Sequence, residues 1–150
     1  MTNEITVLAT LENISKVTGF VDQHLIAFNC PLRTRIQLKV AVDELLGNIA
    51  NYAYYPNHGH ATIRVDVEKE PTRVILTFID SGVPYDPLSR EAPDISLPAR
   101  QRQIGGLGIF MVRKTMDSIS YEYKNGQNIL TVLKNVEPSL SETKGSDQNL

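Results

Sequence analysis

The sequence predicts an α+β protein, a two-layer α/β sandwich in which helices cover one face of a mixed or antiparallel sheet. Two observations predict this class. Strand-like runs occur in sequence-adjacent pairs, as in hairpins, and the helical runs stand between these pairs rather than after each strand. In addition, 150 residues with 41% hydrophobic and 21% charged side chains are typical of one globular domain that buries its own core.

One strand and two helices are predicted in the first third of the chain. A β-branched run at residues 2–9 predicts the strand, and Thr10 is of a type that can cap the helix after it. The first helix should end at Cys30-Pro31, and the second should run over residues 32–54. Both helix predictions depend on apolar residues that recur at steps of three and four. These are Ile14, Val17, Val21, Leu25 and Phe28 in the first helix, and Leu38, Val42, Leu45, Ile49 and Tyr52 in the second.

Two hairpins are predicted in the rest of the chain. The alternating or β-branched runs at 61–67 and 72–80 form the first one. The runs at 118–124 and 127–134 form the second, because they flank Asn125-Gly126, the strongest short-range signal for a tight hairpin turn.

A loop, a third helix and a tail complete the expected organisation. Residues 81–104 hold several prolines and show no periodicity, and a long ordered loop in a compact domain is usually functional. The third helix should begin at Gly105-Gly-Leu-Gly108. Residues 135–150 contain few large apolar side chains and predict a disordered tail, so we expect one domain over residues 1–134.

The composition argues against several classes of function. A net charge of −2 at pH 7 lacks the basic excess of nucleic-acid binders, so we expect no nucleic-acid partner. The lone Cys30 cannot form an internal disulfide, and no apolar run reaches the roughly 18 residues of a membrane helix. Because the chain does not open on a charged leader with an apolar stretch, we expect a cytoplasmic protein without a membrane segment.

Glu44 and Asn48 form the first candidate site, inside the second predicted helix. Side chains four residues apart stack on one helix face, with Cβ atoms roughly 5–6 Å apart. A carboxylate and an amide oxygen at this spacing can hold a hydrated Mg²⁺ or position a hydroxyl, and the alternative is an ordinary solvated helix face. Gly47 lowers helix stability by about 1 kcal/mol relative to Ala, which suggests a close approach to the backbone there.

Two further segments are candidates for binding a nucleotide. Asp80-Ser-Gly-Val-Pro-Tyr-Asp86 follows an apolar strand, so the acceptor-only Asp80 can hold an exocyclic amine while Gly82 lets the backbone lie against a ring. The alternative is a common turn. Gly105-Gly106-Leu107-Gly108 opens a helix, where free backbone N–H groups can face an anion; the alternative is a plain loop-to-helix joint. This segment fits neither the Walker A nor the dinucleotide-binding pattern.

Taken together, the three segments resemble a known ATP-binding family. The order Glu-x-x-x-Asn on a helix, Asp-x-Gly-x-Pro after a strand and Gly-x-Gly after a long loop is similar to the GHKL superfamily of gyrase, histidine kinases and MutL. Within it, Glu44, the proline of the second segment, Gly105-Gly-Leu-Gly-Ile-Phe-Met-Val and the small size resemble the anti-sigma-factor serine/threonine kinases, the SpoIIAB/RsbW-like group. The resemblance spans residues 5–134 and implies the GHKL (Bergerat) fold, a histidine kinase-like ATPase domain.

The resemblance also implies an ATP site with assigned roles. Asn48 would coordinate the Mg²⁺ that bridges the phosphates, and Asp80 would accept a hydrogen bond from the adenine amino group. Gly82 would border the base, and Thr131 would support adenine from behind. The third motif, with Gly106, Leu107 and Gly108, would bracket the phosphates beneath a lid formed by residues 88–104. Glu44 would be the base that orients or deprotonates the attacking hydroxyl.

The chain departs from the family pattern at one position. Tyr52 stands four residues after Asn48, where many relatives place a basic residue or histidine. Arg100 and Arg102 in the predicted lid could supply the missing phosphate contact, or could be solvated charges. His58 and His60 are only two residues apart, with no thiolate or third ligand nearby, so we interpret them as polar loop residues rather than metal ligands.

The resemblance implies a function and partners. The expected protein is an ATP-dependent serine/threonine kinase that acts as an anti-sigma factor, phosphorylates a STAS-type anti-anti-sigma protein, sequesters a sigma factor and forms a homodimer. One alternative is an ATP-binding sequestering module without phosphoryl transfer, against which Glu44 argues. Another is a detached histidine-kinase ATPase domain, which would need a phosphorylatable histidine on a separate helix pair that the sequence does not encode.

Overall fold

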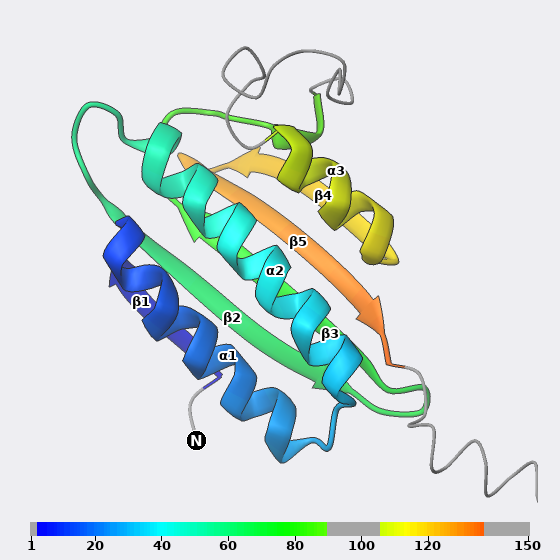
Figure 1. Ribbon diagram of the computed structural model, residues 1–150. Helices are drawn as coiled ribbons and strands as arrows, with labels where there is room; N and C mark the ends of the chain where they lie inside the picture. Colours follow the sequence, from blue (N-terminus) through cyan, green and yellow to red (C-terminus); the bar gives the residue numbers. More distant parts are fainter. Residues whose placement is uncertain (1–2, 90–105, 137–150) are drawn as a thin grey trace, which may run out of the picture.

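The predicted α+β sandwich is confirmed by the computed structural model, which describes residues 3–89 and 106–136. Within these two ranges, three α-helices lie on one face of a five-stranded sheet (Figure 1). The sheet has the order β1-β2-β3-β5-β4, and every neighbouring pair is antiparallel. The elements are β1 Glu4–Leu8, η1 Leu11–Asn13, α1 Ile14–Ala27, α2 Leu32–Asn48, η2 Ile49–Ala53, β2 His60–Glu68, β3 Arg73–Asp80, η3 Pro87–Ser89, α3 Gly106–Thr115, β4 Ser118–Lys124 and β5 Gln127–Asn135.

The second helix differs from its prediction at its carboxyl end. The α-helical part ends at Asn48, and Ile49–Ala53 continues it as a π-helix. Wider turns of this kind are rare in proteins, and many of those that do occur lie at functional sites. Thr10 also differs from its prediction: its side chain makes no capping hydrogen bond, whereas the Asn13 side chain donates to the Leu8 carbonyl over 2.8 Å.

The second hairpin turn is confirmed in its backbone geometry. Asn125 and Gly126 have φ angles of 53° and 77°, as a type I′ turn requires. The positive φ values let β4 and β5 pair in tight register, with Lys124 opposite Gln127.

The core lies between the sheet and the helices. It is built from alternate residues of the strands and from one stripe of each helix, including Ile63, Val65, Val74, Leu76, Phe78, Leu130 and Val132 of the sheet, Val17, Val21, Leu25, Leu38, Val42 and Leu45 of α1 and α2, and Ile109, Val112 and Met116 at α3. At one end of the sheet, the same buried face continues into two polar residues, Asp80 and Asn128, which lie opposite each other in the β3–β5 register. This polar end is where the site forms.

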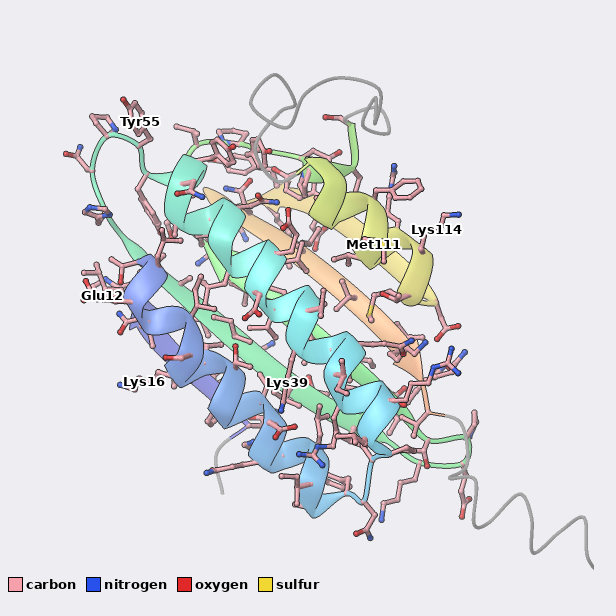
Figure 2. The ribbon with its side chains drawn as sticks, viewed as in Figure 1. Glu12, Lys16, Lys39, Tyr55, Met111 and Lys114 are labelled. Carbon is pink, nitrogen blue, oxygen red and sulfur yellow. The ribbon has the colours of Figure 1, made fainter. Side chains whose placement is uncertain are left out.

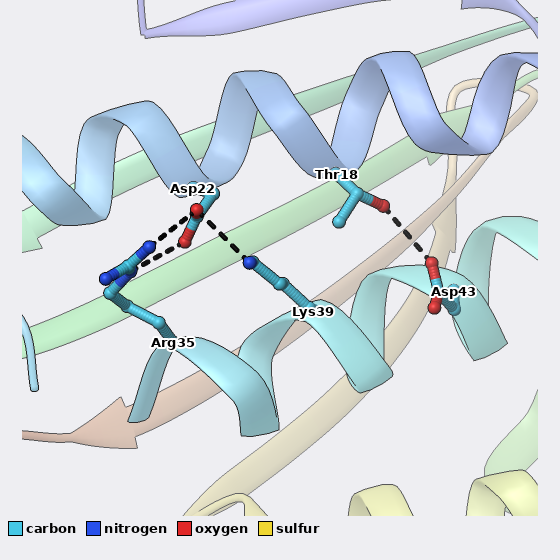
Figure 3. A network of polar contacts seen from close by, with 5 residues as sticks. All are labelled: Thr18, Asp22, Arg35, Lys39 and Asp43. Carbon is cyan, nitrogen blue, oxygen red and sulfur yellow. Dashed lines mark hydrogen bonds and ion pairs between the residues drawn. The ribbon is translucent and has the colours of Figure 1, made fainter. Parts of the chain in front are cut away.

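The helices α1 and α2 are joined by an ion-pair network (Figure 3). Two Arg35 nitrogens donate to the two Asp22 carboxylate oxygens, each over 2.8 Å, and Lys39 Nζ lies 3.2 Å from Asp22 Oδ2. Figure 2 shows Lys39 directed toward α1, while Lys16, Met111 and Lys114 extend from the outer surface of the helices. The network fixes α2 beside α1, on the sheet.

None of the helices in the two described ranges is both long and apolar enough to cross a lipid bilayer.

We expect Asp22→Asn to destabilise the fold in a pH-dependent way. The hydrogen bond from Arg35, followed by the Lys39 contact, holds the Asp22 pKa below its usual 3.8 against the opposing effect of burial. The stability from this carboxylate is therefore full above the unfolded-state pKa and is lost as the pH falls through the folded-state pKa. Denaturant unfolding from pH 7 to pH 2 should show the gap between wild type and variant closing at acidic pH.

The control for this prediction is Asp43→Asn, on the same helix interface. Asp43 is exposed and accepts a hydrogen bond from the Thr18 hydroxyl over 3.1 Å rather than from two cations. This variant should lose less stability than Asp22→Asn. A gap for Asp22→Asn that stays constant down to pH 2 would contradict the assigned role of the carboxylate.

Candidate functional site: a pocket at one end of the sheet

A pocket opens where α2 ends and β3 leaves the sheet. Its walls come from the end of α2, the π-helix, the ends of β3, β4 and β5, and the segment that follows β3. The lining residues are Leu45, Asn48, Ile49, Ala53, Phe78, Asp80, Tyr85, Pro87, Tyr121, Asn128 and Leu130. The walls are mainly apolar with a few polar groups that converge, which is typical of a small-molecule site.

Asp80 is the last residue of β3, and its carboxylate lies inside the pocket wall with only 5% of the residue exposed. Asp80 Oδ1 accepts from the Gly82 backbone N–H and from Asn128 Nδ2, both over 2.9 Å. Burial raises the pKa of Asp80, and these two hydrogen bonds oppose the rise. Since both bonds end on Oδ1, Oδ2 is left to accept a donor from a ligand.

Gly82 is required by a close backbone approach. The Val83 N–H donates to the Ala53 carbonyl over 2.8 Å, which ties the segment after β3 to the end of the π-helix. A Cβ at Gly82 would overlap that same carbonyl oxygen. The glycine therefore lets the two backbones meet beside Asp80, and it places the segment at the edge of the pocket.

Asn128, Tyr121 and Tyr85 form a hydrogen-bond network that the sequence analysis missed. Asn128 Oδ1 accepts from the Tyr121 hydroxyl over 2.5 Å and from the Tyr85 backbone N–H over 3.1 Å. Asn128 Nδ2 also donates to the Val83 carbonyl over 2.9 Å. The sequence offered only an asparagine within a predicted strand. The tertiary structure decided that this side chain is buried and therefore needs hydrogen-bond partners.

Asn48 and Glu44 lie on neighbouring turns of α2, near the pocket. Asn48 is buried, at 7% exposure, and lines the pocket directly. Glu44 is half-buried, and its Oε1 is buried without a hydrogen-bond partner among the described residues. Burial raises the pKa of Glu44. A buried unpartnered carboxylate oxygen lowers stability, so its presence here suggests a function.

Gly108 of α3 gives the Glu44 carboxylate its space. A Cβ at Gly108 would overlap the Glu44 carboxylate oxygens. The amino-terminal turn of α3 is thereby brought against α2 one turn from Asn48. Gly106 begins α3, and Leu107 follows it in the same turn.

Tyr52 and Tyr85 stack beside the pocket. Their ring centroids are 5.3 Å apart with an interplanar angle of 20°, a geometry typical of offset stacking. Tyr52 therefore joins the π-helix to the segment after β3. The position where the family resemblance led us to expect a basic residue or histidine holds an aromatic contact in this chain.

Two expectations are corrected by the structure. Thr131 lies on the opposite face of the sheet, in a row with Thr77 and Ser120, and Asn128 and Leu130 line the pocket instead. The reason is the two-residue period of a strand, which sends neighbouring side chains to opposite faces. Apart from the neighbouring residues and backbone of its own helix, no described atom lies within 4 Å of a Cβ built on Gly47, so no described segment makes the close approach expected there.

The other predicted residues lie elsewhere. Arg100 and Arg102 fall outside the described residues, as does most of the predicted lid, residues 88–104. His60 begins β2, where its carbonyl accepts a hydrogen bond from the Tyr54 hydroxyl. Within the described ranges, no group of three His, Cys, Asp or Glu side chains is placed to hold a metal ion.

The comparisons with known proteins agree on one family. The model of the histidine kinase-like ATPase domain family matches residues 7–134. The chain is 32% identical over 106 residues to the serine/threonine-protein kinase BtrW of Bordetella bronchiseptica. The matched region covers 71% of this chain and 74% of that protein.

Similarity to serine-protein kinases named RsbW is more distant. Identity is 28% over 97 residues to RsbW of Bacillus cereus, covering 62% of this chain and 59% of that protein. It is 26% over 98 residues to RsbW of Listeria monocytogenes, covering 62% of this chain and 61% of that protein. The matched region thus spans about three fifths of these two relatives.

We expect opposite effects from an added methyl group at two glycines. Gly82→Ala should lower the free energy of unfolding by about 1–3 kcal/mol, because the Cβ overlaps backbone that cannot move aside. Gly47→Ala should raise it by about 0.5–1 kcal/mol, because the site is helical and open. Urea unfolding measures both, and a neutral Gly82→Ala would disprove the close approach.

We expect Glu44→Gln to be more stable than wild type at neutral pH. Burial raises the folded-state pKa of Glu44, so ionisation of this side chain destabilises the fold. The destabilisation is complete when the pH is above the folded-state pKa, and it is absent when the pH is below the unfolded-state pKa. The gain from glutamine should therefore shrink as the pH falls through this window. The control, Glu12→Gln, changes an exposed side chain and should leave stability nearly unchanged. Thermal melts at several pH values test this prediction. A Glu44→Gln variant that is less stable than wild type at pH 7 would contradict the effect of burial.

Proposed function

This chain belongs to the histidine kinase-like ATPase family, and we propose that it is an ATP-dependent serine/threonine-protein kinase that acts as an anti-sigma factor. The observation that carries the proposal is that Asn48 and Asp80, which come from two separate motifs, line one pocket, with Glu44 one helical turn before Asn48. The names of BtrW and RsbW as protein kinases support the same activity.

In this proposal the pocket takes the adenine end of ATP. Asp80 Oδ2 accepts a hydrogen bond from the exocyclic amine, since Oδ1 is already engaged. Apolar walls from Phe78, Leu130 and Ile49 suit the faces of a purine. Gly82 borders the base through the segment that it allows to approach Ala53.

The phosphates lie toward α3 in this proposal. The donor set fits a magnesium ion, because the carboxamide oxygen of Asn48 is a hard ligand that lines the pocket, and Mg²⁺ takes few protein ligands. When bound, Mg²⁺ neutralises charge on the phosphates. The backbone of Gly106, Leu107 and Gly108 would face the phosphates at the amino terminus of α3, where N–H groups favour anions.

Glu44 is the proposed general base. Its half-buried position and raised pKa suit a carboxylate that accepts a proton during the reaction. The hydroxyl oxygen of the acceptor serine or threonine forms a bond to the γ-phosphorus, the bond from that phosphorus to the ADP oxygen breaks, and the hydroxyl proton passes to Glu44. ADP leaves with the electron pair of the broken bond.

The proposed partners are a STAS-type anti-anti-sigma protein as the phosphoryl acceptor and a sigma factor as the sequestered protein. A homodimer is the proposed assembly. The domain that carries these functions extends over residues 1–134, in agreement with the matched range 7–134. No nucleic acid is a partner in this proposal, and the cytoplasm is the proposed location.

The test is phosphoryl transfer from labelled ATP and Mg²⁺ to a purified STAS-domain protein, the proposed class of acceptor. Glu44→Gln should lose about 10²–10⁴-fold in transfer rate and keep its ATP affinity, because it removes only the base. Asn48→Ala should weaken Mg²⁺-dependent ATP binding. Glu12→Gln, at an exposed site, should transfer at the wild-type rate. Tight ATP binding by the wild type without any transfer would favour a sequestering module instead.

A further inference from the structure

Asn128 uses its full hydrogen-bonding capacity in the pocket wall. An asparagine side chain has two N–H donors and an oxygen that accepts two bonds. Both donors are engaged by Asp80 Oδ1 and the Val83 carbonyl, and the oxygen accepts from Tyr121 and Tyr85. If the carboxamide were turned over, its N–H groups would point at the Tyr121 hydroxyl and the Tyr85 N–H, which both act as donors here. The orientation is therefore fixed by the partners, and only 6% of the residue is exposed.

This arrangement fixes the Asp80 carboxylate as well. Asp80 Oδ1 receives one hydrogen bond from across the sheet and one from the Gly82 backbone. The carboxylate cannot rotate without breaking both bonds. Oδ2 is held as an acceptor for a ligand, and Asn128 has no remaining donor to offer.

The pocket can therefore select purines by the group that they carry at position 6. A 6-amino group donates to a carboxylate oxygen, whereas a 6-oxo group would bring a second acceptor against it. A site that leaves buried polar groups unpaired with the wrong ligand discriminates strongly against that ligand. We propose that Asn128 is a positioning residue that sets the preference of this pocket for 6-amino over 6-oxo purine nucleotides, an inference that rests on the proposed nucleotide site.

A merely structural role for Asn128 gives a different expectation. Loss of the network would then lower the stability of the fold and reduce the affinity for every purine nucleotide in proportion. The ratio of affinities for two ligands that differ only at the 6-position would not change. That ratio is the quantity to measure.

The experiment compares Asn128→Thr with Asn128→Val by calorimetric titration with ATP and with inosine triphosphate. These side chains have the same shape and suit a strand, but only threonine keeps a hydroxyl that can donate to Asp80, which lies directly opposite in the register. The threonine variant should keep most of the wild-type preference for ATP. The valine variant should lose about tenfold to a hundredfold of that preference, as expected for a hydrogen bond to a charged group.

Asn135→Val is the matched control. Asn135 ends the same strand with an exposed side chain, far from the pocket, and its substitution should leave the ratio at the wild-type value. Thermal melts of all variants show whether each one is folded under the titration conditions. If the valine variant does not fold, Asn128→Ala takes its place, because alanine also offers no donor to Asp80 and should lose the same preference.

The outcomes separate this inference from the proposed function. A folded valine or alanine variant with the wild-type ratio of affinities would overturn the role of Asn128 while the nucleotide site stands. A wild-type protein that binds neither ATP nor inosine triphosphate would overturn the proposed nucleotide site itself.

Discussion

A buried carboxylate at the end of an apolar sheet face is the constraint on which the site depends. Asp80 continues the core-facing row of β3 beyond Phe78, where an unsatisfied charge would be costly. Two hydrogen bonds to one oxygen offset that cost, and each ties another segment to the pocket. The Gly82 bond holds the segment after β3, and the Asn128 bond holds β5, so the pocket walls and the fold share the same contacts.

Glu44 shows the opposite arrangement. Its Oε1 is buried beside Gly108 without a partner among the described residues, although a carboxylate is more stable in water or in an ion pair. The same protein pairs Asp22 with Arg35 and Lys39 at the neighbouring helix interface. The carboxylate of Asp22 is thus satisfied where α1 and α2 meet, whereas Glu44 Oε1 is left without a partner near the pocket, as is expected at a functional site.

The position of α2 links these two regions. Its first half is joined to α1 by charged contacts, its middle packs on the sheet, and its last turn presents Asn48 to the pocket. The π-helix then carries the chain to Ala53, whose carbonyl receives the Val83 N–H. A wider helical turn at this place sets where the backbone meets Gly82, so a local departure from α-helical geometry positions the pocket edge.

The sequence by itself determined the order of elements, the hairpin turn at Asn125-Gly126 and the motifs, because helical periodicity, turn chemistry and motif spacing are local properties. It could not decide between Thr131 and Asn128. In β5, both sets of alternate residues contain large apolar side chains, Leu130 on one face and Ile129 on the other, so alternation gave no signal for the buried face. Only the packing of helices against the sheet decided it, because that packing brings Asn128 opposite Asp80.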